Sequence, residues 1–292
     1  MAATQPADAI HYVYALGDPA AAAPARCSAR VEVRTGEALA GVAVDGARAR
    51  VALWRTPRAS GRALRSDAAE QFFFVLEGGL VADIGGQLLT VPAQHALHVP
   101  PATPHALYAA EDSAFIVAVA RGAAPVEPGD WQSGAAPGAP RTTGDGTVPR
   151  YVYAIDTLDA VPPGASSAKV VAKNFVSGKS SSFGAALSGA ALHVGVIHKA
   201  RGSGAKLHTH PNEQFNVVLE GTLIGEIAGA QMEVVPYGLI HMPAGVQHCT
   251  AASGAGDLTV FVVKDTSHGL SGPPVDGIED GPRYLPGFGP QS

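Results

Sequence analysis

The chain has 292 residues, about twice the common domain size of roughly 150 residues, so two domains are expected. Charged residues make up only 15% of it and hydrophobic residues 46%, which excludes a largely disordered protein. The formal net charge is −5 and basic residues form no block, which argues against nucleic acid as a partner.

Short apolar runs and few cysteines limit the cellular context. No apolar run approaches the roughly 20 residues of a membrane helix, so no membrane partner is expected. Residues 1–12 lack the basic and apolar segments of a secretory signal, and we expect a cytoplasmic protein. The only cysteines, Cys27 and Cys249, are far apart in the sequence, which excludes a disulfide framework or a cysteine-based zinc site.

The chain contains an internal repeat. Residues 51–121 align without a gap with residues 194–264, at a constant offset of 143 (194 minus 51, and 264 minus 121). An echo precedes each copy, because Tyr12–Ala15 returns as Tyr151–Ala154. Two copies of one fold follow, an N-terminal domain over residues 1–121 and a C-terminal domain over residues 150–266.

In chain order, each copy is a series of short strands. Glycine pairs such as Gly78-Gly79 and Gly85-Gly86 separate β-rich runs in the first copy, and no run has a helical period. The second copy predicts strands over residues 192–197, 215–219, 222–227, 232–235, 240–242 and 258–263. We therefore expect an all-β protein made of two tandem jelly-roll barrels.

Two segments fall outside the copies. Residues 122–149 contain many Gly, Pro, Ala and Ser residues and are expected to be a linker. Residues 267–292 are expected to form an extended tail, held on the surface by Tyr284, Leu285 and Phe288.

The second copy has the residue pattern of a metal site. His208 and His210 share one face of a strand, Gln214 follows four residues later, and His248 comes from a later strand. Neutral imidazoles and an amide oxygen suit one divalent transition metal ion, whether Fe, Mn, Zn, Ni or Cu. Glu213 is the alternative to Gln214, but strand alternation places it on the opposite side.

These residues resemble the two motifs of the cupin family, and the whole chain resembles a bicupin. The matching patterns are Gly202-x5-His208-x-His210-x3-Gln214-x6-Gly221 and Gly238-x4-Pro243-x-Gly245-x2-His248, with glutamine at the position where glutamate is the commonest residue. The resemblance implies two cupin barrels and a metal held by the three histidines and Gln214. Among cupins, sets of three histidines and one glutamine occur in isomerase-like enzymes.

The first copy lacks the metal-binding pair. Arg65 and Asp67 stand at the positions of His208 and His210, so no metal is expected there, since the cationic Arg65 would repel it. An ion pair between Arg65 and Asp67 is expected to fill the vacated site. The functional alternative is an anion pocket formed by Arg55 and Arg65.

His198 and Lys206 are the candidate catalytic residues. His198 precedes the ligand strand and is a candidate proton shuttle, while Lys206 shares the face of His208 and is a candidate partner for a substrate carboxylate. Exposed positions at the barrel rim are the plain alternative for both. His98 and His241, which match each other across the repeat, are expected to be structural or to line the barrel mouth.

Three functions remain open. The first is a metal-dependent isomerase or tautomerase of a small oxo acid or sugar acid, in which the metal stabilises an enolate. The second is an Fe(II)-dependent dioxygenase of a diketone or enol, and the third is a bicupin that only binds or senses a small molecule. A small-molecule substrate is the expected partner, and a second copy of the chain, giving a homodimer, is a further candidate.

Overall fold

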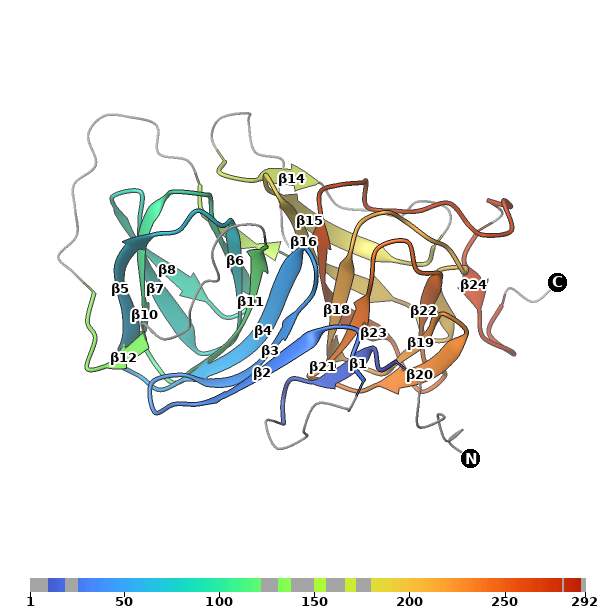
Figure 1. Cartoon of the computed structure of the whole chain (residues 1–292), viewed down its shortest axis with the longest axis horizontal. Coiled ribbons are helices and arrows are strands. Elements are labelled where there is room, and N and C mark those ends of the chain that lie inside the picture. Colours follow the sequence, from blue (N-terminus) through green and yellow to red (C-terminus); the bar gives the residue numbers. More distant parts are fainter. Residues whose placement is uncertain are drawn as a thin grey trace.

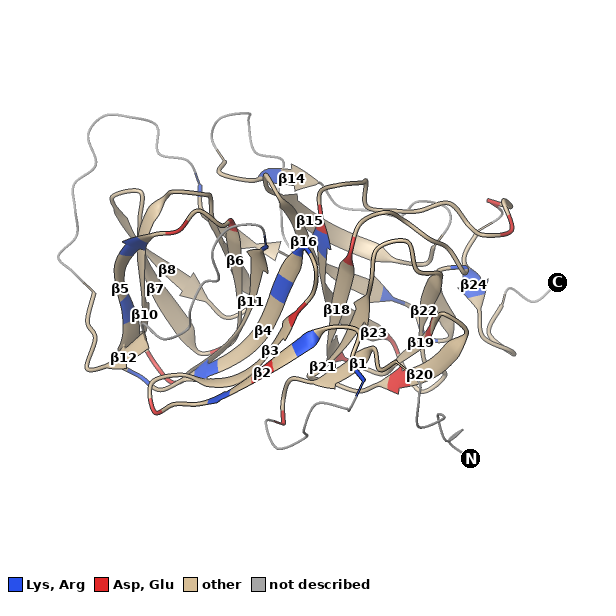
Figure 2. Ribbon diagram, in the orientation of Figure 1, with Lys and Arg blue, Asp and Glu red and all other residues tan. Residues whose placement is uncertain are grey.

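The computed structural model describes residues 10–18, 26–121, 131–137, 150–155, 166–171, 180–279 and 281–289. Its strands form four antiparallel sheets that close into two barrels side by side (Figure 1), which confirms the all-β fold expected from the repeat. Within these ranges no helix has the length and apolar character needed to cross a membrane. Lys and Arg residues are spread over the strands of both barrels (Figure 2).

The N-terminal barrel consists of a seven-stranded and a five-stranded sheet. Its strands are β2 (Arg30–Thr35), β3 (Ala40–Asp45), β4 (Ala49–Thr56), β5 (Ser60–Ser66), β6 (Gln71–Glu77), β7 (Gly79–Ile84), β8 (Gln87–Pro92), β9 (His95–Val99), β10 (Pro104–Ala109), β11 (Ser113–Ala120), β12 (Trp131–Ser133) and β13 (Val152–Ala154). The larger sheet has the order β13-β9-β6-β11-β4-β3-β2 and the smaller one β12-β5-β10-β7-β8.

The C-terminal barrel repeats this arrangement. Its strands are β1 (Val13–Ala15), β14 (Lys169–Val171), β15 (Phe183–Ser188), β16 (Leu192–Lys199), β17 (Ser203–Gly204), β18 (Gln214–Glu220), β19 (Leu223–Ile227), β20 (Ala230–Val234), β21 (Gly238–Met242), β22 (His248–Ala252), β23 (Leu258–Asp265) and β24 (Arg283–Tyr284). The sheets have the orders β1-β21-β18-β23-β16-β15-β14 and β20-β19-β22-β17-β24. The hairpin after β18 needs Gly221, whose φ of 77° and close approach to the Asp257 carbonyl leave no space for a side chain.

The two barrels exchange their leading strands. β1 pairs with β21 in the C-terminal barrel, and β13 pairs with β9 in the N-terminal barrel. Each copy of the repeated Tyr-Val-Tyr-Ala segment therefore extends a sheet of the other barrel (Figure 1). Residues 12–15, which the repeat assigned to the N-terminal domain, thus belong structurally to the C-terminal barrel.

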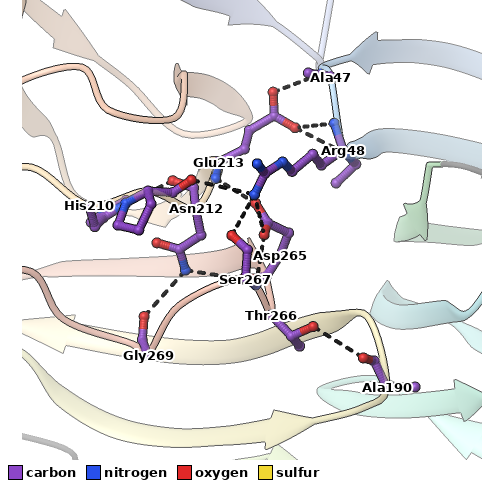
Figure 3. Close-up of polar contacts among 12 residues, drawn as sticks. Ala47, Arg48, Ala190, His210, Asn212, Glu213, Asp265, Thr266, Ser267 and Gly269 are labelled. Atoms are coloured by element: carbon purple, nitrogen blue, oxygen red, sulfur yellow. Dashed lines mark hydrogen bonds and ion pairs between the residues drawn. The ribbon is translucent and has the colours of Figure 1, made fainter.

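A buried carboxylate from each barrel binds a turn of the other. Glu70 accepts hydrogen bonds of 2.7–2.8 Å from the backbone N–H groups of residues 190–192, between β15 and β16. Glu213 accepts bonds of 2.8–3.0 Å from those of residues 47–49, between β3 and β4 (Figure 3). His98 and His241 lie 3.0 and 2.9 Å from these carboxylates, so both histidines belong to the junction of the barrels.

Three apolar clusters complete the packing. One lies between the barrels, where the rings of Phe74 and Phe261 stack with centroids 4.9 Å apart. A second fills the N-terminal barrel, and a third occupies part of the C-terminal barrel. The rest of the C-terminal interior holds histidine, glutamine and lysine side chains, which form the site described below.

The segments outside the copies each add a strand to one of the barrels. Residues 131–137 of the expected linker are described, and β12 pairs there with β5, while residues 122–130 and 138–149 lie outside the described ranges. The tail runs over the C-terminal barrel, where β24 pairs with β17 and the Leu285 N–H bonds the Gly202 carbonyl at 2.8 Å. Phe288 lies under the Arg201 guanidinium at 5.5 Å, and Tyr284 is partly exposed.

Candidate metal centre

The C-terminal barrel brings three histidines together. His208, His210 and His248 each offer one ligand atom, and these atoms lie within 4.8 Å of one another. The backbones of His208 and His248 exchange two hydrogen bonds, of 3.0 and 2.9 Å, so the two residues face each other directly. His210 follows two residues after His208, and its Nε2 joins the same group.

Hydrogen bonds to backbone carbonyls orient all three rings. The Nδ1 atoms of His208, His210 and His248 lie 2.7–2.8 Å from the carbonyl oxygens of Lys206, Asn212 and Val246. Each Nδ1 must therefore carry the proton, so each Nε2 is unprotonated and has a lone pair suited to a metal ion.

Burial, the largest cause, lowers the pKa of His208 and His210 to about 4 and that of His248 to about 2, so the rings stay neutral. The buried Nε2 of His248 has no hydrogen-bond partner. A buried acceptor without a partner is costly, and a metal ion at this point removes that cost.

Gln214 supplies an oxygen to the same point. Its Nε2 donates to Asn216 Oδ1 at 2.7 Å, which turns Oε1 toward His210 Nε2 at 3.1 Å. Both facing atoms are acceptors. Their separation fits two neighbouring ligands of one ion, with metal bonds of about 2.1 Å. The residues present therefore fit a divalent metal, with Glu213 directed away into the junction (Figure 3).

Two buried lysines beside the centre had no sequence signal of their own. Lys264 on β23 is the cross-strand neighbour of Gln214, and its Nζ lies 3.2 Å from His210 Nε2 and donates to the Leu270 carbonyl at 2.7 Å. Lys199 on β16 donates to the carbonyl and the hydroxyl of Thr250, at 2.8 and 2.7 Å. Burial lowers the pKa of Lys264 to about 7 and that of Lys199 to about 8.

A cavity of about 120 Å³ opens beside the metal ligands His208 and Gln214. An engineered cavity of about 150 Å³ holds benzene, so this one suits a small organic molecule. Its lining includes Lys199, Lys206, Lys264, Asn216 and tail residues 270–272 and 274, and in the described part of the chain it contains no aspartate or glutamate.

The two candidate catalytic residues, His198 and Lys206, do not lie among the metal ligands. His198 points to the other face of β16, where its ring stacks on Phe183 and its Nδ1 lies 3.0 Å from Thr259 Oγ1. Because alternate residues of a strand face opposite sides, Lys199 points into the metal cavity and His198 does not line it. We therefore assign His198 no role in that cavity. Lys206 lines the cavity mouth, but its Nζ lies 3.5 Å from Asp276 and 3.3 Å from the Ile278 carbonyl, both in the tail.

In the N-terminal barrel, arginine side chains lie where the C-terminal barrel has its metal centre. Arg65 and Asp67 form the expected ion pair at 2.7 Å. The residue next to the remaining histidine is Arg62, which is buried and lies 2.6 Å from His105 Nε2. For the alternative of an anion pocket, Arg55 is half-exposed on β4 and lies 3.7 Å from Glu77, while Arg65 pairs with Asp67.

Comparisons with known proteins agree with this fold. Residues 56–120 and 195–264 match the family model described as the cupin domain. No curated protein sequence matches the chain. A mutant oxalate decarboxylase from Bacillus subtilis is 12% identical, with a TM-score of 0.61 over 90% of this chain and 79% of that one.

Two further solved structures show the same similarity. AerE from Microcystis aeruginosa is 11% identical, with a TM-score of 0.59 over 81% of this chain and 96% of that one. An oxalate decarboxylase structure from Bacillus subtilis whose Mn(II) centres were studied is 13% identical, with a TM-score of 0.60 over 90% of this chain and 79% of that one. At such identities the similarity is one of fold.

Proposed function

The chain is a bicupin, and we propose that its C-terminal cupin domain is a metal-dependent enzyme that isomerises a small oxo acid or sugar acid. One observation carries the proposal: the ligand atoms of three histidines and the Gln214 Oε1 lie together, and His208, Gln214 and Lys264 line a small cavity beside them. A metal centre, an amine and room for a small molecule are thus present at one point.

The residues of the chain divide the work of such a reaction. His208, His210, Gln214 and His248 would hold the ion, which supplies Lewis acidity for a carbonyl oxygen. All four ligands are neutral, so none of them offsets the charge of the ion.

We assign the transfer of the proton to Lys264. In the isomerisation a proton leaves the carbon next to the carbonyl group and returns to a neighbouring atom, without any oxidant. The Lys264 Nζ is held beside the ligands by the Leu270 carbonyl, in a position to carry that proton across the cavity. Tail residues 270–272 and 274 cover this side of the cavity and help to exclude water.

Anaerobic proton exchange tests the proposal. Protein purified without added metal is assayed for bound ions and then incubated under nitrogen in D₂O with a panel of oxo acids and sugar acids. NMR should show deuterium entering next to the carbonyl group, together with the isomeric product. His208→Ala should abolish both, whereas Arg65→Ala, at the matching position of the N-terminal barrel, should retain them.

Other outcomes would replace the proposal. Consumption of O₂ in step with the substrate would make the protein a dioxygenase. Bound metal with tight ligand binding but no turnover would make it a binding protein.

A further inference from the structure

We infer that the ligand of this cavity carries two anionic groups, and that Lys199 binds the one remote from the metal centre. The inference rests on the proposed function, which it deepens by naming the substrate class: a small oxo dicarboxylate.

The starting point is a buried cation without a counter-ion. Lys199 is only 4% exposed, and no carboxylate of the described residues lies within ion-pair distance of its Nζ. A buried charge is normally paired, because removal from water is costly. An ammonium group has three N–H donors, of which two reach Thr250, so one remains for a ligand.

The cavity offers no other partner for this charge. Lys199 and Thr250 line it, and its described lining contains no acidic side chain. Lys206 differs, because its ammonium already lies near the Asp276 carboxylate. In the N-terminal barrel the position of Lys199 is taken by Thr56, whose hydroxyl donates to the Ala38 carbonyl.

The place of Lys199 sets the spacing of the two anionic groups. Thr250 follows His248 by two residues on β22 and lies on the same face, which separates them by ~7 Å at the strand rise of about 3.3 Å per residue. The second anionic group is therefore bound at the Thr250 end of the cavity, displaced along β22 from the metal ligand His248.

A matched pair of ligands tests the inference by binding alone. 2-Oxoglutarate and 2-oxopentanoate have the same five-carbon chain and differ only in the distal carboxylate. Calorimetric titration of protein loaded with Mn(II) should show tighter binding of 2-oxoglutarate by about 10- to 100-fold, the range for one charged hydrogen bond. Lys199→Met should remove this preference and leave binding of Mn(II) and 2-oxopentanoate unchanged.

Control variants separate the role of Lys199 from that of its neighbours. Lys199→Arg should restore part of the preference, and Lys206→Met should retain it. Lys199→Met removes a buried charge, and the Thr250 carbonyl keeps its 3.0 Å bond from the Ala205 N–H. Without ligand, this variant should therefore melt no lower than the wild type.

Three results would overturn the inference: equal affinities in the wild type, a preference that survives Lys199→Met, or a lower melting temperature of that variant together with loss of Mn(II). The proposed function fails separately. Tighter binding of 2-oxoglutarate without turnover of any substrate would support the site for two anionic groups and refute the isomerase. Turnover with equal affinity for the two ligands would support the isomerase and refute the site for two anionic groups.

Discussion

Replacing Glu213 by glutamine is expected to weaken the junction between the barrels and to leave the metal centre intact. The carboxylate accepts hydrogen bonds from the N–H groups of Ala47 and Arg48 (Figure 3). It also accepts one from the Ala49 N–H and lies 2.9 Å from His241 Nε2. None of these partners is a candidate ligand. Glu213→Gln therefore tests the geometry that makes the next residue, Gln214, the ligand.

The size of the effect follows from the hydrogen bonds. A glutamine amide keeps one acceptor oxygen but turns an NH₂ group toward backbone N–H donors, so at least one buried N–H group loses its partner. One unsatisfied buried donor costs about 1–3 kcal/mol, and the charged bonds weaken as well. We expect a loss of ~2–4 kcal/mol in the free energy of unfolding, or ~5–10 °C in Tm.

Differential scanning calorimetry measures the stability, and titration with Mn(II) measures the site. Glu70→Gln is the matched control, because Glu70 makes the equivalent bonds to residues 190–192 and adjoins no metal centre. Both variants should lose similar stability and bind one ion per chain. Loss of metal at unchanged Tm in Glu213→Gln would make Glu213 the ligand and refute the reasoning.

The same variant gives a pH test of known sign. Burial opposes ionisation of Glu213, but hydrogen bonds from His241 and the backbone outweigh it and lower its pKa from the ordinary 4.5. A carboxyl group whose pKa is lower in the folded state adds stability above the unfolded value, and this is lost as the pH falls through the folded value. The Tm difference between wild type and Glu213→Gln should be constant from pH 6 to 8 and shrink below about pH 4.5.

Further predictions concern the metal site and its cover. His248→Ala should abolish binding of the single ion, while His105→Ala at the equivalent N-terminal position should leave it unchanged, as read by metal analysis; equal loss would contradict a single C-terminal site. Gly272→Ala should lower Tm by a few degrees and weaken Mn(II) binding several-fold, because a Cβ there collides with the Thr209 carbonyl and presses on His210. Gly269→Ala, where a Cβ meets nothing within 4 Å, is its control, and the same loss in both would refute the collision.

The sequence by itself carried the architecture and the candidate ligand set. An ungapped repeat implies two equal folds, and glycine-separated runs of alternating residues imply strands that close into barrels. Strand alternation predicted that His208, His210 and Gln214 share a face and that Glu213 points away. The grouping is right, but the expected strand is not there: residues 209–213 lie outside the strands, and a bend at residues 211–212 separates His210 from Gln214 at the start of β18.

The tertiary structure decided what lies opposite each residue. Lys199 and Arg62 look like ordinary charged residues in the sequence, yet one lies beside Thr250 and the other beside His105, each from a distant strand. The exchange of β1 and β13 and the anchoring of Glu70 in the other barrel also join segments separated by more than 50 residues. Such contacts depend on which strands become neighbours when the barrels close, and periodicity along one strand carries no record of that choice.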